Sequence, residues 1–159
     1  MSSDVRPATI KDIPGEIRQL LRMAGRAYLG TLTSRLDVGY PFVTLVVPAL
    51  GTDEAPLLLL SDLSDHAKNL QQNKHVSLLF DGTLDRAEPL TGPRVTLLGN
   101  LSVSEAPEDR DAYLAQHPEA ELYAGFGDFR FYRFNLLEAL YVAGFGRIHR
   151  LSAADLQTG

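Results

Sequence analysis

The sequence predicts a mainly β fold, an antiparallel barrel of about six or seven strands with short helices at its periphery. Short runs rich in aromatic and β-branched residues recur along the chain, and turn-forming residues separate them. One run, Pro56 to Ser61, is continuously apolar, too short for a helix and of the right length for a buried strand. In addition, Gly99 interrupts a long alternating run, as expected at a barrel corner.

The first elements are a helix and a β-hairpin. Apolar residues recur at near-helical spacing from Ile13 to Met23, and Pro14 suits a first helical turn. Two strand-like segments follow, Arg26 to Thr33 and Tyr40 to Leu50, with the turn-like SRLDVG between them. Because proline cannot donate to a strand ladder, Pro48 predicts an end or a bulge in the second strand.

The middle of the chain alternates between strands and a helix. The strand Pro56 to Ser61 leads into a helix that begins near Ser64, and His75 to Phe80 forms the next strand. The alternating run Arg94 to Val103 is a long strand, and Gly99 within it indicates a bulge or a second backbone passing close by.

The last part of the chain contains a helix and the closing strands. We expect a helix within Glu105 to Pro118, with Ser104 as its N-cap. Two short strands follow, Phe129 to Phe134 and Ala139 to Val142. The length fits a single domain over residues 1–159. Its expected parts are an N-terminal helix at 13–24, the barrel at 26–151 and a tail at 152–159.

The composition argues against several classes of protein. A formal charge of −5 and a pI near 5.3 disfavour nucleic acid as a partner. There is no cysteine, so disulfides and thiolate metal sites are impossible. The N-terminal MSSDVRPATIKDIP carries charges and a proline where a signal peptide needs an apolar core, and no apolar run is long enough to span a bilayer. We therefore expect a cytoplasmic protein.

The stretch SDLSDHAKNLQQNKH places polar side chains where a strand gives way to a helix. Backbone N–H groups without intrahelical partners gather there, so Ser64, His66, Lys68 and Asn69 could hold an anion such as phosphate. The alternative is an ordinary N-cap by Ser64 with solvated neighbours, which explains every residue without a ligand.

Other candidate residues have structural explanations. The four histidines show no metal-binding spacing, so we predict no metal site. We expect solvated helix carboxylates at Asp109, Asp111, Glu119 and Glu121. The aromatic residues of His117 to Phe134 could form core and a subunit contact, or line a planar cofactor pocket. Arg147 either ends a strand or reaches an anionic group at a dimer interface.

A series of segments also occurs in an order known from one superfamily: GTLTS, GYPFVTLVVPAL, LLLLSDLSDHAKNLQQNKHVSLLF, GPRVTLLGNLSV, YLAQHPEAELYAGFGDFRFYRF and VAGFGRIHRL. From about Ala24 to Leu151, the chain resembles the pyridoxamine 5′-phosphate oxidase-like, FMN-binding split-barrel superfamily. It is most similar to the branch that includes haem-utilisation proteins.

This resemblance implies a split-barrel homodimer with FMN in a groove between the subunits, and an FMN-dependent oxidoreductase whose substrate is unassigned. It implies that the strand-to-helix turn holds the flavin phosphate and that the first barrel strand lies along the flavin. The implied cofactor contacts are Thr31, Thr33, Ser61, Ser64, His66, Lys68, Asn69 and Arg147.

Two departures from the family pattern keep other functions open. Oxidase members place an arginine–lysine pair at the helix start, where this chain has Asp65 and His66. Haem-utilisation members carry a further C-terminal region that contributes to haem binding and has no counterpart here. The alternatives to FMN binding are a haem-binding or haem-degrading protein on the same fold, and a non-catalytic dimeric module that has lost its cofactor.

Overall fold

The structure is a computed structural model that describes residues 12–157. Two parts of the chain lie outside the described residues. They are residues 1–11, which make up most of the segment compared with a signal peptide, and the last two residues of the expected tail. In chain order the elements are α1 Ile13–Met23, β1 Ala27–Leu32, β2 Pro41–Val46, β3 Ala49–Leu50, β4 Pro56–Ser61, α2 Asp65–Gln72, β5 His75–Asp81, η2 Pro89–Thr91, β6 Arg94–Val103, α3 Pro107–Gln116, η3 Pro118–Ala120, α4 Glu121–Ala124, β7 Phe129–Gly144, β8 Arg147–Ser152 and α5 Ala153–Gln157.

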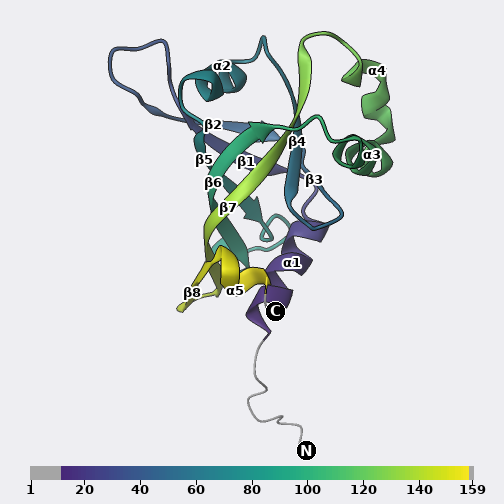
Figure 1. Cartoon of the computed structure of the whole chain (residues 1–159). Coiled ribbons are helices and arrows are strands. Elements are labelled where there is room, and N and C mark those ends of the chain that lie inside the picture. The colour runs from purple at the N-terminus through teal and green to yellow at the C-terminus, as the bar shows by residue number, and fades with distance from the viewer. Residues whose placement is uncertain (1–11, 158–159) are drawn as a thin grey trace, which may run out of the picture.

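The strands form one curled antiparallel sheet, which confirms the predicted mainly β split barrel (Figure 1). Eight strands take part, in the order β2-β1-β5-β6-β7-β4-β3, and β8 pairs with β7. The two ends of this order, β2 and β3, are joined by Val47 and Pro48. The break predicted at Pro48 is therefore where the chain passes from one end of the sheet to the other.

The prediction of two short closing strands is wrong, because both lie in β7, which is one continuous strand of 16 residues. Its first half pairs with β4, and its second half pairs with β8, a strand that the sequence analysis did not separate from the end of the barrel. The bulge predicted at Gly99 is confirmed as a register shift between Leu98 and Gly99, opposite Glu138 and Leu136 in the stretch between the two expected strands. A Cβ atom at Gly99 would lie 2.1 Å from the carbonyl oxygen of Asn135, so the close backbone approach is confirmed as well.

The continuous apolar run of β4 serves two hydrophobic cores. Leu58 and Leu60 face the main core inside the sheet, and Leu57 and Leu59 face a second core beneath α3. Because side chains alternate across a strand, burial on both faces requires an unbroken apolar sequence. Several of the aromatic residues between His117 and Phe134 join these cores, as predicted.

The start of α3 differs from the prediction. Ala106 is its N-cap and makes no side-chain cap hydrogen bond, because alanine has no side-chain acceptor, and Pro107 occupies the first helical position. Ser104 instead donates its hydroxyl to Asp109. The expectation that Asp109 is solvated is also wrong, since the residue is only 2% exposed and pairs with Arg133.

Within the part of the chain that the structure describes, no helix is both long enough and apolar enough to cross a lipid bilayer.

Candidate functional site

The turn from β4 into α2 forms the corner that the sequence analysis singled out; we call residues Ser61–Asn69 the α2 corner. Ser64 caps α2, since its hydroxyl accepts a hydrogen bond from the Ala67 N–H at 3.3 Å and donates to the Ser61 carbonyl at 2.7 Å. The backbone N–H groups of Asp65 and His66 donate to no other described residue. These two groups are the part of the corner that is free to meet an anion.

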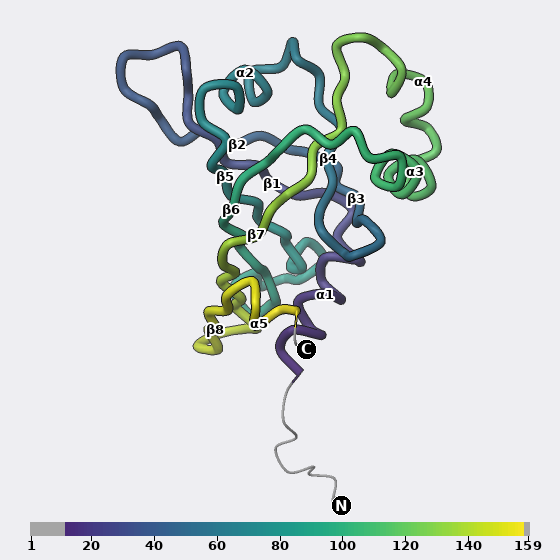
Figure 2. The backbone as a smooth tube through the Cα atoms, in the orientation of Figure 1, coloured from purple at the N-terminus to yellow at the C-terminus, as the bar shows by residue number. Residues whose placement is uncertain are grey.

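Two side chains of the corner are already engaged within the protein. The Ser61 hydroxyl donates to Asp128 Oδ2 at 2.6 Å. Asn69 is 4% exposed, donates to the Thr31 hydroxyl at 3.0 Å, and accepts from the backbone N–H of Ser34 at 3.0 Å. Asn69 therefore holds the loop after β1 against α2, and these two elements lie side by side in Figure 2.

The two candidate cations of the corner differ in their surroundings. His66 is half-buried, and its Nδ1 lies 2.9 Å from the Thr44 hydroxyl of β2. Burial lowers the pKa of His66, although the neighbouring Asp65 opposes this shift. A neutral His66 adds no positive charge. Of the two candidate cations, the exposed Lys68 then carries the only charge.

Carboxylates outnumber cations around the α2 corner. Asp65 and Asp128 join Asp62, which forms an ion pair with Arg130 at 2.9 Å. Three carboxylates thus face two cations, Arg130 and Lys68. A phosphate would meet two free N–H groups but also repulsion from these acids, so the residues present fit a phosphate poorly.

The remaining sequence-predicted residues are Thr31, Thr33 and Arg147. Thr31 is buried, and Thr33 accepts a hydrogen bond from the Tyr40 N–H within the hairpin at 2.9 Å. Arg147 is exposed at the start of β8, at the opposite end of the molecule from α2 (Figure 1). One chain therefore does not bring Arg147 to the corner.

A second candidate site is the face of the sheet that points away from the main core, which the sequence analysis did not identify. We call it the outer face. Paired strands place side chains of the same face opposite each other, so the register defines its members. One row across six strands is Leu45, Tyr28, Leu79, Thr96, Leu140 and Arg150. The neighbouring row is Val43, Gly30, Ser77, Leu98, Glu138 and Ser152.

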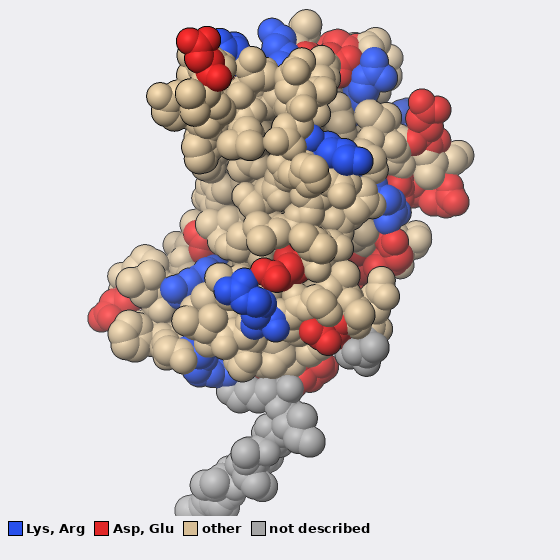
Figure 3. All heavy atoms as spheres, turned by 60° about the vertical axis from the view of Figure 1, so that its left-hand side comes forward, with Lys and Arg blue, Asp and Glu red and all other residues tan. Residues whose placement is uncertain are grey.

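Large apolar side chains of the outer face are exposed. The exposed fractions are 67% for Val43, 56% for Leu45 and 63% for Ile148. In the row between Val43 and Leu98, the Ser77 hydroxyl occupies the space over Gly30, since a Cβ atom at Gly30 would lie 2.5 Å from its oxygen. Figure 3 shows one side of the molecule on which charged side chains are sparse over the middle. A sheet face that exposes several large apolar side chains is a candidate interaction surface.

His75 is the described histidine best placed to meet a ligand on the outer face. It is exposed, begins β5 on the same face as Ser77, and its Nδ1 lies 3.0 Å from the side-chain oxygen of Asn73. This contact leaves Nε2 toward solvent or a ligand. The other three histidines are His66 beside Thr44, His117 beside the Pro48 carbonyl and His149 stacked on Tyr141.

Sheet topology and outer face together define a split β-barrel protein of the pyridoxamine 5′-phosphate oxidase-like type. The CREG β-barrel family model matches residues 8–157, and the chain belongs to this family.

The chain is similar to three proteins that differ in their described functions. It is 38% identical over 132 residues to the chloroplastic heme oxygenase HOZ of Arabidopsis thaliana, covering 81% of this chain and 40% of that protein. A heme binding protein from Mycobacterium smegmatis has a TM-score of 0.85 and 25% identity, covering 95% of this chain and 62% of the other. A general stress protein 26-related protein of the pyridoxinephosphate oxidase family from Clostridium acetobutylicum has a TM-score of 0.69 and 13% identity, covering 93% and 99%. The chain thus spans less than two thirds of both haem-related proteins.

Proposed function

We propose that the chain is a haem-binding protein that works as a homodimer, with haem held against the outer face near His75. The observation that carries the proposal is an exposed apolar sheet face with an imidazole at its margin. Two similar proteins are described by their names as a heme oxygenase and a heme binding protein, which supports the same ligand.

The residues of the outer face fit the chemistry of haem. Haem is a flat, largely apolar group, and the exposed apolar side chains of the outer face, such as Val43 and Leu45, offer it a surface to pack on. Haem iron commonly takes an imidazole nitrogen, and a ligating histidine usually directs its other ring nitrogen to a carbonyl or carboxylate oxygen. Asn73 supplies such an oxygen to His75 Nδ1.

Cations for the haem carboxylates are also present on this face. Arg94 lies opposite Val142, and Arg150 lies opposite Leu140. Arg150 is exposed and pairs with Glu138 at 2.7 Å, so it can exchange this surface partner for a haem carboxylate. When bound, haem would supply the oxygen chemistry that the name of the Arabidopsis relative indicates.

The proposed homodimer follows from the exposed area of the outer face. Val43 and Leu45 on β2 and Leu98 on β6 lie on this same face and are exposed, and a second copy would remove them from water. Because His75 begins β5 and Arg94 pairs with Asp81 at the other end of that strand, a groove between two such faces is what would bring His75 of one copy and the arginines of the other near one ligand. A cytoplasmic location remains a prediction.

Parallel titrations with haemin and FMN test the proposed function. Purified protein is mixed with an excess of either group, passed over a gel-filtration column and read by visible absorption. We expect a Soret band to elute with the protein at the dimer position, and less flavin than haem to be retained. Retention of FMN without haem would overturn the proposal, and retention of neither by an intact dimer would favour a non-catalytic module.

FMN binding with an oxidoreductase function is the second candidate, because the α2 corner offers the free N–H groups of Asp65 and His66 beside Lys68. If FMN is retained, Lys68→Ala should weaken its binding by about tenfold, since a charged hydrogen bond contributes about 1.5–3 kcal/mol.

A further inference from the structure

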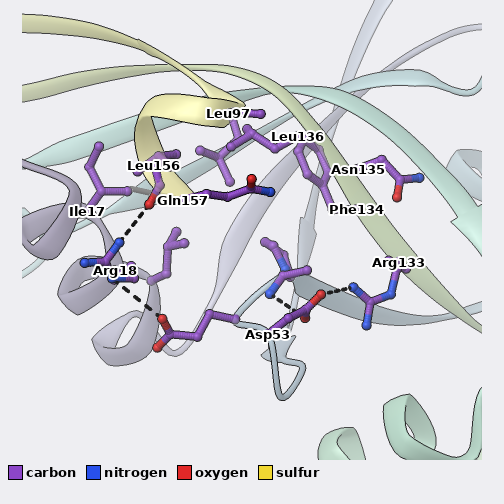
Figure 4. Close-up of a pocket in the computed structure, with 15 residues that line it drawn as sticks. Ile17, Arg18, Asp53, Leu97, Arg133, Phe134, Asn135, Leu136, Leu156 and Gln157 are labelled. Carbon is purple, nitrogen blue, oxygen red and sulfur yellow. Dashed lines mark hydrogen bonds and ion pairs between the residues drawn. The ribbon is translucent and has the colours of Figure 1, made fainter. Parts of the chain in front are cut away.

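A cavity of about 660 Å³ lies at a gap in the sheet, between α1 and α5 (Figure 4). On one edge of β7, β4 pairs as far as Arg133 and β8 begins at Glu138, so no described strand pairs with residues 134–137 there. The turn before β4 and helix α5 after β8 form the two sides of this gap. The cavity has the size of a small-molecule site.

Nine of the fifteen residues that line the cavity are apolar. Ile17 and Leu21 from α1, Phe134 and Leu136 from β7, and Leu156 from α5 line it. A ligand with an aliphatic or aromatic body would therefore gain free energy by leaving water here.

Arg18 supplies a cation at one end of the cavity. Its Nη1 donates to the Leu156 carbonyl at 2.9 Å, and its Nε lies 3.7 Å from Glu54 Oε1. Glu54 is engaged more tightly by Arg22, at 2.9 and 2.6 Å. A guanidinium has five N–H donors, so Arg18 keeps donors for a further acceptor.

The two ends of the cavity differ in charge. Arg18 and Arg22 both pair with Glu54, so the residues of these two ion pairs carry a formal excess of one positive charge. At the other end Arg133 pairs with both Asp53 and Asp109, an excess of one negative charge. Figure 4 shows Arg18 and Arg133 on opposite sides of the cavity. An anionic group would therefore be directed to Arg18.

We infer that this cavity binds a small monocarboxylic acid with an apolar body, whose carboxylate meets Arg18 and whose body packs on the walls between α1, α5 and β7. The cavity shares no lining residue with the outer face, so the site is independent of the proposed haem site. A second cavity of about 790 Å³ is lined by four carboxylates and one cation, Arg26, and would repel such an acid.

The experiment is a calorimetric titration of the full chain with decanoate below its micellar concentration. Decanol, which has an alkyl chain of the same length but no carboxylate, is the second probe. We expect saturable decanoate binding and at least about tenfold weaker binding of decanol. Arg18→Gln should weaken decanoate binding by at least about tenfold and leave decanol binding unchanged. Ala153→Phe, which fills space at the cavity wall, should abolish binding of both probes.

Arg35→Gln is the matched control, because Arg35 is an exposed arginine in the loop after β1 and does not line the cavity. It should bind decanoate like the unmodified chain. Each variant is compared by circular dichroism and by haemin titration, which the cavity variants should leave unchanged. Equal binding of decanoate by Arg18→Gln and Arg35→Gln, or no saturable binding by a folded chain, would overturn the inference.

Discussion

Arg133 donates two hydrogen bonds to the carboxylate of Asp109, from Nη2 to Oδ1 at 2.6 Å and from Nε to Oδ2 at 3.1 Å. It donates a third, from Nη1 to Asp53, at 2.7 Å. One guanidinium thereby connects β7 to α3 and to the turn before β4. The Asp109 side chain is 3% exposed, so its charge depends on these partners.

Replacing Asp109 should destabilise the fold markedly. Asp109→Asn keeps the shape but removes the charge opposite Arg133, and we expect the free energy of unfolding to fall by about 2–4 kcal/mol. Chemical denaturation measures this change. Asp111→Asn, one exposed position of the same helix, is the control and should stay within about 0.5 kcal/mol. Equal effects of the two substitutions would contradict the structural role of the pair.

The same pair predicts a pH dependence of stability. The hydrogen bonds from Arg133 hold the pKa of Asp109 below its usual value, and the Ser104 hydroxyl adds to this effect. A carboxyl whose pKa is depressed by folding stabilises the folded state above its unfolded pKa of about 3.9, and this contribution is lost as the pH falls through the folded pKa. The difference in unfolding free energy between the unmodified chain and Asp109→Asn should thus shrink from pH 7 to pH 3. A difference that is constant with pH would contradict this assignment.

Asn69 should act on stability rather than as a ligand contact. Asn69→Ala removes the partner of the buried Thr31 hydroxyl and of the Ser34 N–H, so we expect a loss of about 1–3 kcal/mol. Thermal unfolding in the absence of any ligand is the measurement, and Gln71→Ala on the exposed side of α2 is its control. An unchanged melting temperature would contradict this structural role. It would favour Asn69 as a cofactor contact, as the family resemblance implies.

The outer face should control the oligomeric state. Leu45→Glu places two like charges in a two-fold contact, and we expect the dimer dissociation constant to rise at least tenfold, or about 1.4 kcal/mol. Light scattering over a dilution series reads the mass. Leu122→Glu changes an equally apolar residue that is 80% exposed on α4, away from the outer face, and should leave the mass unchanged. A Leu45→Glu protein with the same mass as the unmodified chain would exclude this face as the interface.

Local patterns were sufficient to predict most of the barrel. The four leucines of β4 indicated burial on both faces, and Gly99 indicated the bulge, because each feature depends on the residue's own steric and hydrophobic properties. The continuity of β7 was not predictable in this way. The stretch between the two expected strands stays extended, because β7 takes up one extra residue, Leu137, opposite the Leu98–Gly99 step of β6.

The candidate site was harder to predict than the fold. Ser61 and Asn69 have the side chains of an anion site, but their partners, Asp128 and Ser34, are distant in sequence. Asp109 belongs to a segment with the composition of a surface helix, and only the structure shows that Arg133 pairs with it. The outer face was predictable in part, since Val43 and Leu45 alternate with half-buried residues, but only the strand register shows which side chains of the other strands share their face.

The most direct test of the proposed function is a haemin titration of the unmodified chain, His75→Ala and His149→Ala, followed by visible absorption. We expect His75→Ala to weaken haemin binding by at least about tenfold and to shift the Soret band, with added imidazole restoring the original spectrum. His149 is stacked on Tyr141, and its replacement should leave the spectrum unchanged. A Soret band of the same position and affinity in His75→Ala would contradict the placement of haem at the outer face.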